Sequence, residues 1–527
     1  MKTVNATLAP IALAMLFGSG GAFAHERLGK VNFPNSCNPA VAGNFNTSIA
    51  LLHSFWAKEA IEGFNRVLKE DPSCAMAYWG IAMASQGNPL TGQEPSPQSS
   101  QAALAALSKA DAAGAKTPRE RDYLAAIELI YKDGDKVPFR ARRQAYEKAM
   151  EAMAQRYPDD TEVAIFHALS LNMTADLADK TYANQLKAAS ILEKLSPQQP
   201  EHPGISHYLI HSYDYPAIAE KGVASASLYA KAAPDNPHAL HMPSHIFTRL
   251  GTWQASIESN KRSAAAAKAE FNGQEQAHAL DYMTYAHLQL GQDAEAKRIV
   301  AEALAIDTIP PAVFIGPYAL AAMPAREALE RRAWKDAAVL KVQASRFPFT
   351  VAISHFARGL GLARTGDVEE AQKEIAQLAT LRDALNEQKN TYWSRQVEVQ
   401  RLAVVGWTAL AQRQQAEALQ SMRASADLED SMEKHIVTPA PVVPARELLG
   451  EMLLELKQPA EALQAFESSA QREPNRLRGL YGAAQAAELA GQRDKARSYY
   501  TKLAALTEKG DPTRPEVRRA KAFIAQR

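Results

Sequence analysis

One pattern returns along this chain and sets the strongest limit on its fold. The stretches 278–307, 355–381 and 480–506 each contain two helical segments joined by a glycine-containing turn. In each stretch the turn glycine is followed five residues later by alanine: Gly291 and Ala296, Gly366 and Ala371, Gly491 and Ala496. A single helix pair cannot bury its apolar face alone, so repeated pairs stack into a continuous core. The sequence therefore predicts an all-α fold.

The pattern extends to the N-terminal part of the chain, where segment 59–84 places Ala60, Phe64 and Pro72 at matching offsets. It resembles the tetratricopeptide repeat (TPR) family, whose unit is a 34-residue helix–turn–helix. We count about twelve units at that repeat length. The resemblance implies a right-handed superhelical solenoid with a concave groove. The HPGxxHxxxH and HMPSHIF segments resemble an exported bacterial subgroup.

The N-terminus predicts export. Residues 1–24 contain one basic residue (Lys2), an apolar run over 8–17 and an Ala22-Phe23-Ala24 ending, as in a secretory signal peptide. The run is too short to span a bilayer, although a retained anchor is the alternative. We expect a periplasmic or secreted protein with no membrane insertion after signal cleavage. The chain has 59 basic and 58 acidic residues, so its charge gives no reason to expect nucleic acid as a partner.

Two irregular stretches interrupt the repeats, 91–100 (TGQEPSPQSS) and 306–317 (IDTIPPAVFIGP). They predict breaks between sub-arrays near residues 115 and 312. The expected organisation is a signal peptide, N-terminal TPR-like units, a central array and a C-terminal array, at 1–24, 25–114, 115–312 and 313–527.

The two cysteines fit this organisation. Cys37 precedes the first predicted helix and Cys74 follows its partner, and in an antiparallel helix pair these ends lie close together. Export to an oxidising compartment therefore favours a Cys37–Cys74 disulfide. Two buried free thiols are the alternative, and a metal-binding role is disfavoured because no CxxC spacing exists.

The histidines form the most unusual feature. His207 and His211 are spaced i, i+4, and so are His241 and His245, so each pair shares one helix face. The second pair follows the first by 34 residues, which is one repeat length. The two pairs therefore occupy equivalent places on neighbouring units, although repeat duplication alone is the alternative explanation. Pro243 lies inside the second pair and predicts that a helix begins there.

Several imidazoles with a carboxylate form a ligand set for Zn, Cu, Ni or Fe, with Zn and Cu preferred here. We predict His207, His211, His241 and His245 as metal ligands. Further candidates near them in sequence or at equivalent repeat positions are Asp214, His202, His238, His278 and Asp281.

The TPR resemblance places these residues in the concave groove, at positions that we expect to face solvent. Side chains expected to contact a ligand there are Tyr208, Arg249, Tyr282, Tyr285 and Arg326. We expect a protein or peptide partner, or a small anionic ligand, in a histidine-rich groove that also holds a transition metal. A metalloenzyme or metal carrier and a metal-free interaction scaffold are the alternatives. No sequence motif assigns a catalytic residue.

Overall fold

The computed structural model describes residues 27–526. The predicted signal peptide and its cleavage site lie outside the described residues, so export stays a prediction. In the described part, every regular element is helical, which confirms the all-α prediction. No helix among these residues is both long and apolar enough to cross a membrane.

Eight helices form the N-terminal part of the solenoid: α1 (Ala42–His53), α2 (Ala57–Glu70), α3 (Ala75–Ala84), α4 (Pro97–Ala113), α5 (Pro118–Tyr131), α6 (Phe139–Arg156), α7 (Thr161–Thr174) and α8 (Ala183–Leu195). The central helices are α9 (Pro203–Tyr213), α10 (Val223–Ala232), α11 (Pro237–His241), α12 (Pro243–Arg249), α13 (Trp253–Ala269), α14 (Gly273–Gln289), α15 (Asp293–Leu304), α16 (Ile315–Glu330) and α17 (Trp334–Ala338).

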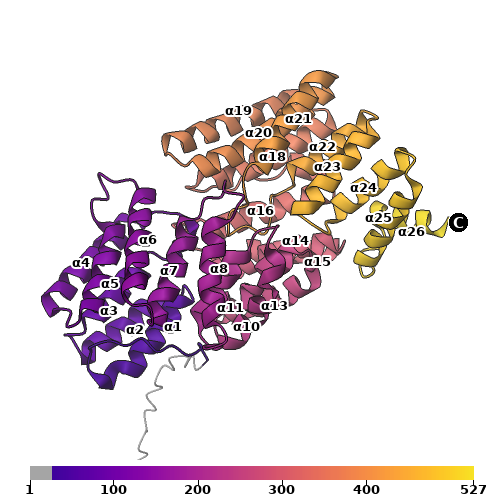
Figure 1. The fold of residues 1–527 in the computed structure, drawn as a ribbon. Helices are drawn as coiled ribbons and strands as arrows, with labels where there is room; N and C mark the ends of the chain where they lie inside the picture. The colour runs from indigo at the N-terminus through magenta and orange to yellow at the C-terminus, as the bar shows by residue number, and fades with distance from the viewer. Residues whose placement is uncertain (1–26, 527) are drawn as a thin grey trace, which may run out of the picture.

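The C-terminal helices are α18 (Pro348–Thr365), α19 (Val368–Glu387), α20 (Thr391–Ala411), α21 (Gln415–Asp430), α22 (Ala445–Glu455), α23 (Pro459–Arg472), α24 (Leu477–Leu489), α25 (Arg493–Leu506) and α26 (Pro515–Ala525). Short 3-10 helices are η1 (Pro39–Val41), η2 (Pro89–Thr91) and η3 (Ala219–Gly222). Consecutive helices pack as neighbours along the chain, which is the arrangement of a helical-repeat solenoid (Figure 1).

The repeat pattern has a direct structural cause. The turn glycines Gly291, Gly366 and Gly491 take left-handed φ angles of 68°, 89° and 76°, a conformation that favours glycine. The alanines five residues later are fully buried, because the second helix of each pair approaches the first closely at this point. The spacing in the sequence therefore marks the turn and the closest approach of each helix pair.

Cys37 and Cys74 form a disulfide with a Cα–Cα distance of 4.8 Å, which confirms the predicted pairing. It joins the lead-in to α1 with the start of α3. The sub-array boundaries near residues 115 and 312 stay predictions.

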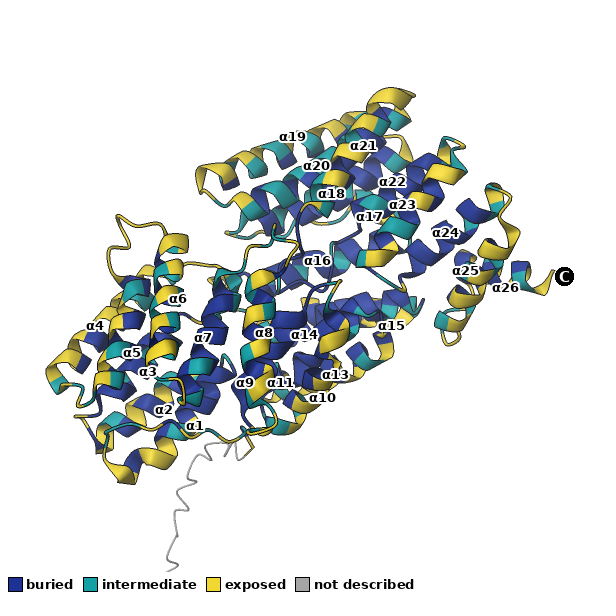
Figure 2. Ribbon diagram, in the orientation of Figure 1, coloured by how far each residue is buried: buried dark blue, intermediate teal, exposed yellow. Residues whose placement is uncertain are grey.

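The solenoid folds back on itself. Helices α18 to α26 form a second row beside the central helices, with α16 between them (Figure 1), and α24 contacts α14. The indole nitrogen of Trp253 donates to the carbonyl of Asn475 (2.8 Å). Residues 431–444, which connect α21 to α22 and which we call the strap, are mostly buried. Helices α7, α9, α14 and α16 are accordingly buried along most of their length (Figure 2).

Candidate metal centre

Four central helices bring six histidines together. Helix α9 carries His207 and His211, α11 carries His238 and His241, α12 carries His245, and α14 carries His278. Five of them are buried and His238 is partly exposed. Because Pro243 divides α11 from α12, His241 and His245 lie on two short helices. Met242 between them stays in the right-handed helical region, so the two side chains still share a face.

His207, His211 and His238 form a first triad, in which the Nε2 atoms converge. The Nε2 atom of His207 lies 3.1 Å from that of His211 and 3.2 Å from that of His238. His241, His245 and His278 form a second triad. The Nε2 atoms of His241 and His245 are 3.0 Å apart, and the rings of His241 and His278 lie 4.3 Å apart between centroids.

Oxygen atoms behind the rings fix three of these imidazoles. His207 donates from Nδ1 to the backbone carbonyl of His53 (2.7 Å), and His245 donates from Nδ1 to the carboxylate of Asp214 (2.9 Å). His241 donates from Nδ1 to Oδ1 of Asn260 (2.6 Å), whose amide nitrogen is held by the carbonyl of Ser256. A neutral imidazole that donates from Nδ1 carries a lone pair on Nε2, so these three Nε2 atoms face the centre as acceptors or ligands.

This hydrogen bonding leaves two acceptor nitrogens of the second triad facing each other with no donor between them. The Nε2 lone pairs of His241 and His245 face each other at 3.0 Å, and two acceptors at that distance repel unless a proton or a cation lies between them. Burial lowers the pKa of His241 well below its ordinary value, helped by the neighbouring imidazoles, which disfavours the proton. Nitrogen ligands about 2.0–2.1 Å from a tetrahedral metal lie roughly 3.3 Å apart, close to the spacing observed here.

Asp214 joins the centre to the rest of the fold. It accepts from His245, from the guanidinium of Arg249 (2.8 Å) and from the ammonium of Lys434 in the strap (3.0 Å). Burial alone would raise the pKa of this carboxyl, but Lys434 and Arg249 hold it well below its usual range. Burial, with Arg249 nearby, lowers the pKa of Lys434 to about 8.

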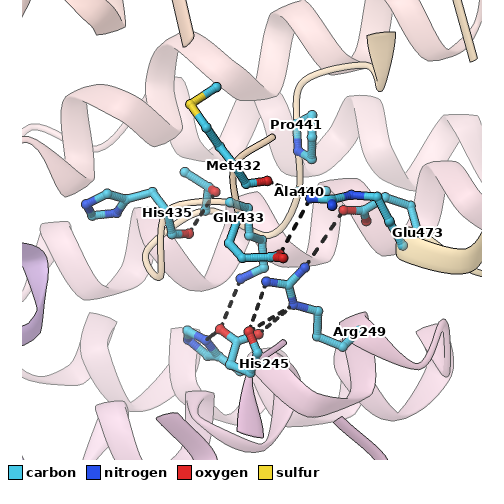
Figure 3. Close-up of polar contacts among 12 residues, drawn as sticks. His245, Arg249, Met432, Glu433, His435, Ala440, Pro441 and Glu473 are labelled. Atoms are coloured by element: carbon cyan, nitrogen blue, oxygen red, sulfur yellow. Dashed lines mark hydrogen bonds and ion pairs between the residues drawn. The ribbon is translucent and has the colours of Figure 1, made fainter. Parts of the chain in front are cut away.

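The strap covers the second triad. Figure 3 shows Met432, Glu433 and His435 of the strap above the helix that carries His245 and Arg249. Beneath it, the hydroxyl of Tyr282 donates to the carbonyl of Thr438 (3.3 Å). The expectation of a solvent-facing groove is therefore wrong, because the returning C-terminal row places its own residues over the histidines.

The five predicted ligand-contacting side chains are buried and mostly engaged within the fold. Arg326 donates to the carbonyls of Ala440 and Pro441, and Tyr285 accepts from Arg476 (2.7 Å). Tyr208 is hydrogen-bonded to His53 (2.9 Å). Together with Tyr282 under the strap and Arg249 on Asp214, these residues position the centre and the strap rather than line an open groove.

The remaining candidate ligands lie elsewhere. His202 is paired through Nε2 with Glu162 (3.0 Å), which also binds Nε2 of His53 (3.1 Å). Glu162 bonds both imidazoles of this buried group, and Nδ1 of His202 has no hydrogen-bond partner among the described residues. The three side chains form a separate cluster from the six histidines of the centre. Asp281 lies 3.4 Å from Arg326. It therefore pairs with the side chain that donates to the strap carbonyls of Ala440 and Pro441.

Several residues around the centre were not found from the sequence. His53, Asn260 and Lys434 lie at no repeat-related spacing from the histidine pairs. Glu275 follows His241 by 34 residues, so the repeat spacing could have found it. His53 ends the apolar helix α1, where its polarity is the one available signal. Asn260 lies in a largely polar helix and Lys434 in the strap, so neither is marked in the sequence.

The fold and the site define an all-α helical-repeat protein with a buried histidine centre. No family model matches the sequence, and no curated protein matches it. Among solved structures, the chain is similar to the human IFIT1 dimer with PPP-AAAA, at 14% identity and a TM-score of 0.39, over 81% of this chain and 90% of that chain. The human IFIT1 dimer with m7Gppp-AAAA gives 14% identity and a TM-score of 0.40, over 82% and 90%. Similarity at these TM-scores supports no conclusion about ligands.

Proposed function

We propose that this protein is an exported helical-repeat protein that binds a transition metal through its buried histidines. The observation that carries the proposal is the convergence of imidazole Nε2 atoms at 3.0–3.2 Å, with the Nδ1 atoms of His207, His241 and His245 held by oxygen. Metal-binding histidines in proteins are fixed by this kind of outer hydrogen bond. Export rests on the signal peptide predicted at residues 1–24.

Copper and zinc fit the donor set best. Imidazole nitrogen suits both metals, whereas magnesium, calcium and manganese prefer carboxylate and carbonyl oxygen. Neither triad contains a carboxylate. The acidic side chains Asp214 and Glu275 lie behind the rings of His245 and His238, where they orient the ligands.

The first prediction concerns metal content. Protein purified from the periplasm without chelator or affinity tag should contain at least one transition metal ion per chain by inductively coupled plasma mass spectrometry. The double variant His207→Ala/His241→Ala should lose the metal, because it removes one fixed ligand from each triad.

His287→Ala is the matched control, since His287 lies at the end of α14 and bonds Gln292, away from both triads. It should retain the metal of the wild-type protein. Absence of metal from wild-type protein with an intact fold, or equal metal in the double variant, would contradict the proposal.

A second candidate function is the binding of a small ligand or peptide end without metal. It is favoured by a pocket of about 960 Å³, a volume that includes space open to solvent, which is lined in part by the strap. Its lining combines aromatic and charged side chains, among them Tyr392, Trp393, Glu429, Lys434 and Arg472. A partner that binds equally well after chelator treatment and in the double variant would support this function over metal binding.

A further inference from the structure

The two triads lie side by side rather than apart. The rings of His211 and His245 are 5.7 Å apart between centroids, and those of His238 and His241 are 6.1 Å apart. The first triad takes its three imidazoles from α9 and α11, and the second takes its three from α11, α12 and α14. The six histidines therefore form two equivalent three-nitrogen sites within one buried volume.

We propose, building on the metal binding proposed above, that each triad holds one copper ion in the cuprous state, and that the pair together reduces dioxygen. The argument has three steps: the charge around the triads, their adjacency, and the apolar access beside the first triad.

The charge of the surroundings favours singly charged ions. The ligands are neutral, and the carboxylate of Asp214 is already neutralised by Arg249 and Lys434. Glu275, whose carboxylate lies 3.5 Å from Nδ1 of His238, has no ion pair with a lysine or arginine among the described residues. Two divalent ions would bring four positive charges into this buried region, whereas two cuprous ions bring two, so the reduced pair is the favoured resting state. The two cupric ions left by the step below are correspondingly strong oxidants, which an external one-electron donor returns to the cuprous state. Uncompensated buried charge is strongly unfavourable.

An apolar cavity lies beside the first triad. It is partly open to solvent, has room for about one water-sized molecule, and is lined by Leu52, Phe55, Ala57, Met83, Gly87, Pro89, Phe166, Leu169 and Tyr208. The ring of Phe55 packs on His207 at 4.4 Å between centroids and lies 6.0–6.1 Å from His211 and His238. A small neutral molecule such as dioxygen suits this lining, whereas an anion or a hydrated cation does not.

The step is a single two-electron transfer. Each cuprous ion gives one electron and becomes cupric. Dioxygen accepts both electrons and becomes peroxide, and the oxygen–oxygen bond is kept as a single bond. Peroxide leaves as hydrogen peroxide after taking two protons from solvent. One ion alone supplies only one of the two electrons, so the adjacency of the triads is what the step requires.

Anaerobic titration with cuprous ion, in competition with a cuprous chelator, measures how many copper ions the two triads bind. We expect two equivalents in the wild-type protein and in His287→Ala, and one equivalent in His238→Ala and in His278→Ala. Circular dichroism establishes that each variant is folded, and His238→Gln and His278→Gln replace any alanine variant that is not. Two equivalents in either single-triad variant would overturn the assignment of ions to triads.

Air is then admitted to the two-copper protein. We expect uptake of one dioxygen per chain and release of one hydrogen peroxide, with at least a tenfold slower reaction in the one-copper variants. Binding of only one equivalent of copper by the wild-type protein would overturn the proposed copper pair but not metal binding itself. Binding of no copper would overturn both proposals. Two equivalents without dioxygen uptake would overturn the electron transfer.

Discussion

Replacing Asp214 by asparagine is expected to lower the free energy of unfolding by about 3–5 kcal/mol, the range for removing one partner of a buried ion pair. The carboxylate is about 1% exposed and faces both Arg249 and Lys434, so the change leaves two buried cations without their shared counter-charge. His245 also loses its anionic partner, and metal affinity should fall about 10- to 100-fold. Urea unfolding of the metal-free protein and a metal competition assay measure the two effects.

The effect of Asp214→Asn should depend on pH in a defined direction. The folded-state pKa of Asp214 lies below the ordinary value, so its stabilising contribution is complete above about pH 4 and is lost as the pH falls further. Asp235→Asn is the control, because its pair with Arg27 is partly exposed and should contribute about 0–1 kcal/mol. An Asp214→Asn protein as stable as this control at pH 7 would contradict the stabilising role of the buried Asp214–Arg249–Lys434 contacts.

Replacing Arg476 by methionine should destabilise the fold by a similar amount, about 3–5 kcal/mol. Arg476 precedes α24 and binds Glu330 of α16, Glu447 of α22 and Tyr285 of α14. The arginine is fully buried and both carboxylates are about 1% exposed, so methionine leaves two buried anions without this cation. The same contacts join the C-terminal row to α14, which carries His278.

Arg423→Met provides the matched comparison for Arg476→Met. Its partner is Glu461, and both side chains are about half exposed, so the expected loss is at most about 1 kcal/mol. The midpoint of urea unfolding of the metal-free proteins compares the two variants. Equal midpoints would show that the Arg476 cluster does not hold the two rows of helices together.

The repeat pattern predicts the fold well because its signals are local. A turn glycine and the alanine five residues later report on one helix pair, and both signals lie within a few turns of chain. The 34-residue offset between the histidine pairs likewise follows from stacking of neighbouring units. These two regularities account for the helices and for the convergence of His207, His211, His241 and His245.

The burial of the centre could not be predicted in the same way. It depends on the strap, whose Lys434 follows Asp214 by 220 residues, and on contacts between α14 and α24. No periodicity connects such distant segments. For the same reason the sequence placed Arg249 and Arg326 in an open groove, whereas the structure pairs both within the fold. His53 contributes through a backbone carbonyl, which any residue type could supply.

The central claim is that the buried triads hold a transition metal, and anomalous diffraction tests it most directly. Crystals of protein purified without chelator should be measured above and below the copper K edge. The account predicts one anomalous peak in each triad, about 2.0–2.1 Å from the coordinating nitrogens, with the peaks lost below the edge if the metal is copper. Diffraction that resolves the histidine side chains and yet shows no anomalous peak in either triad would contradict it.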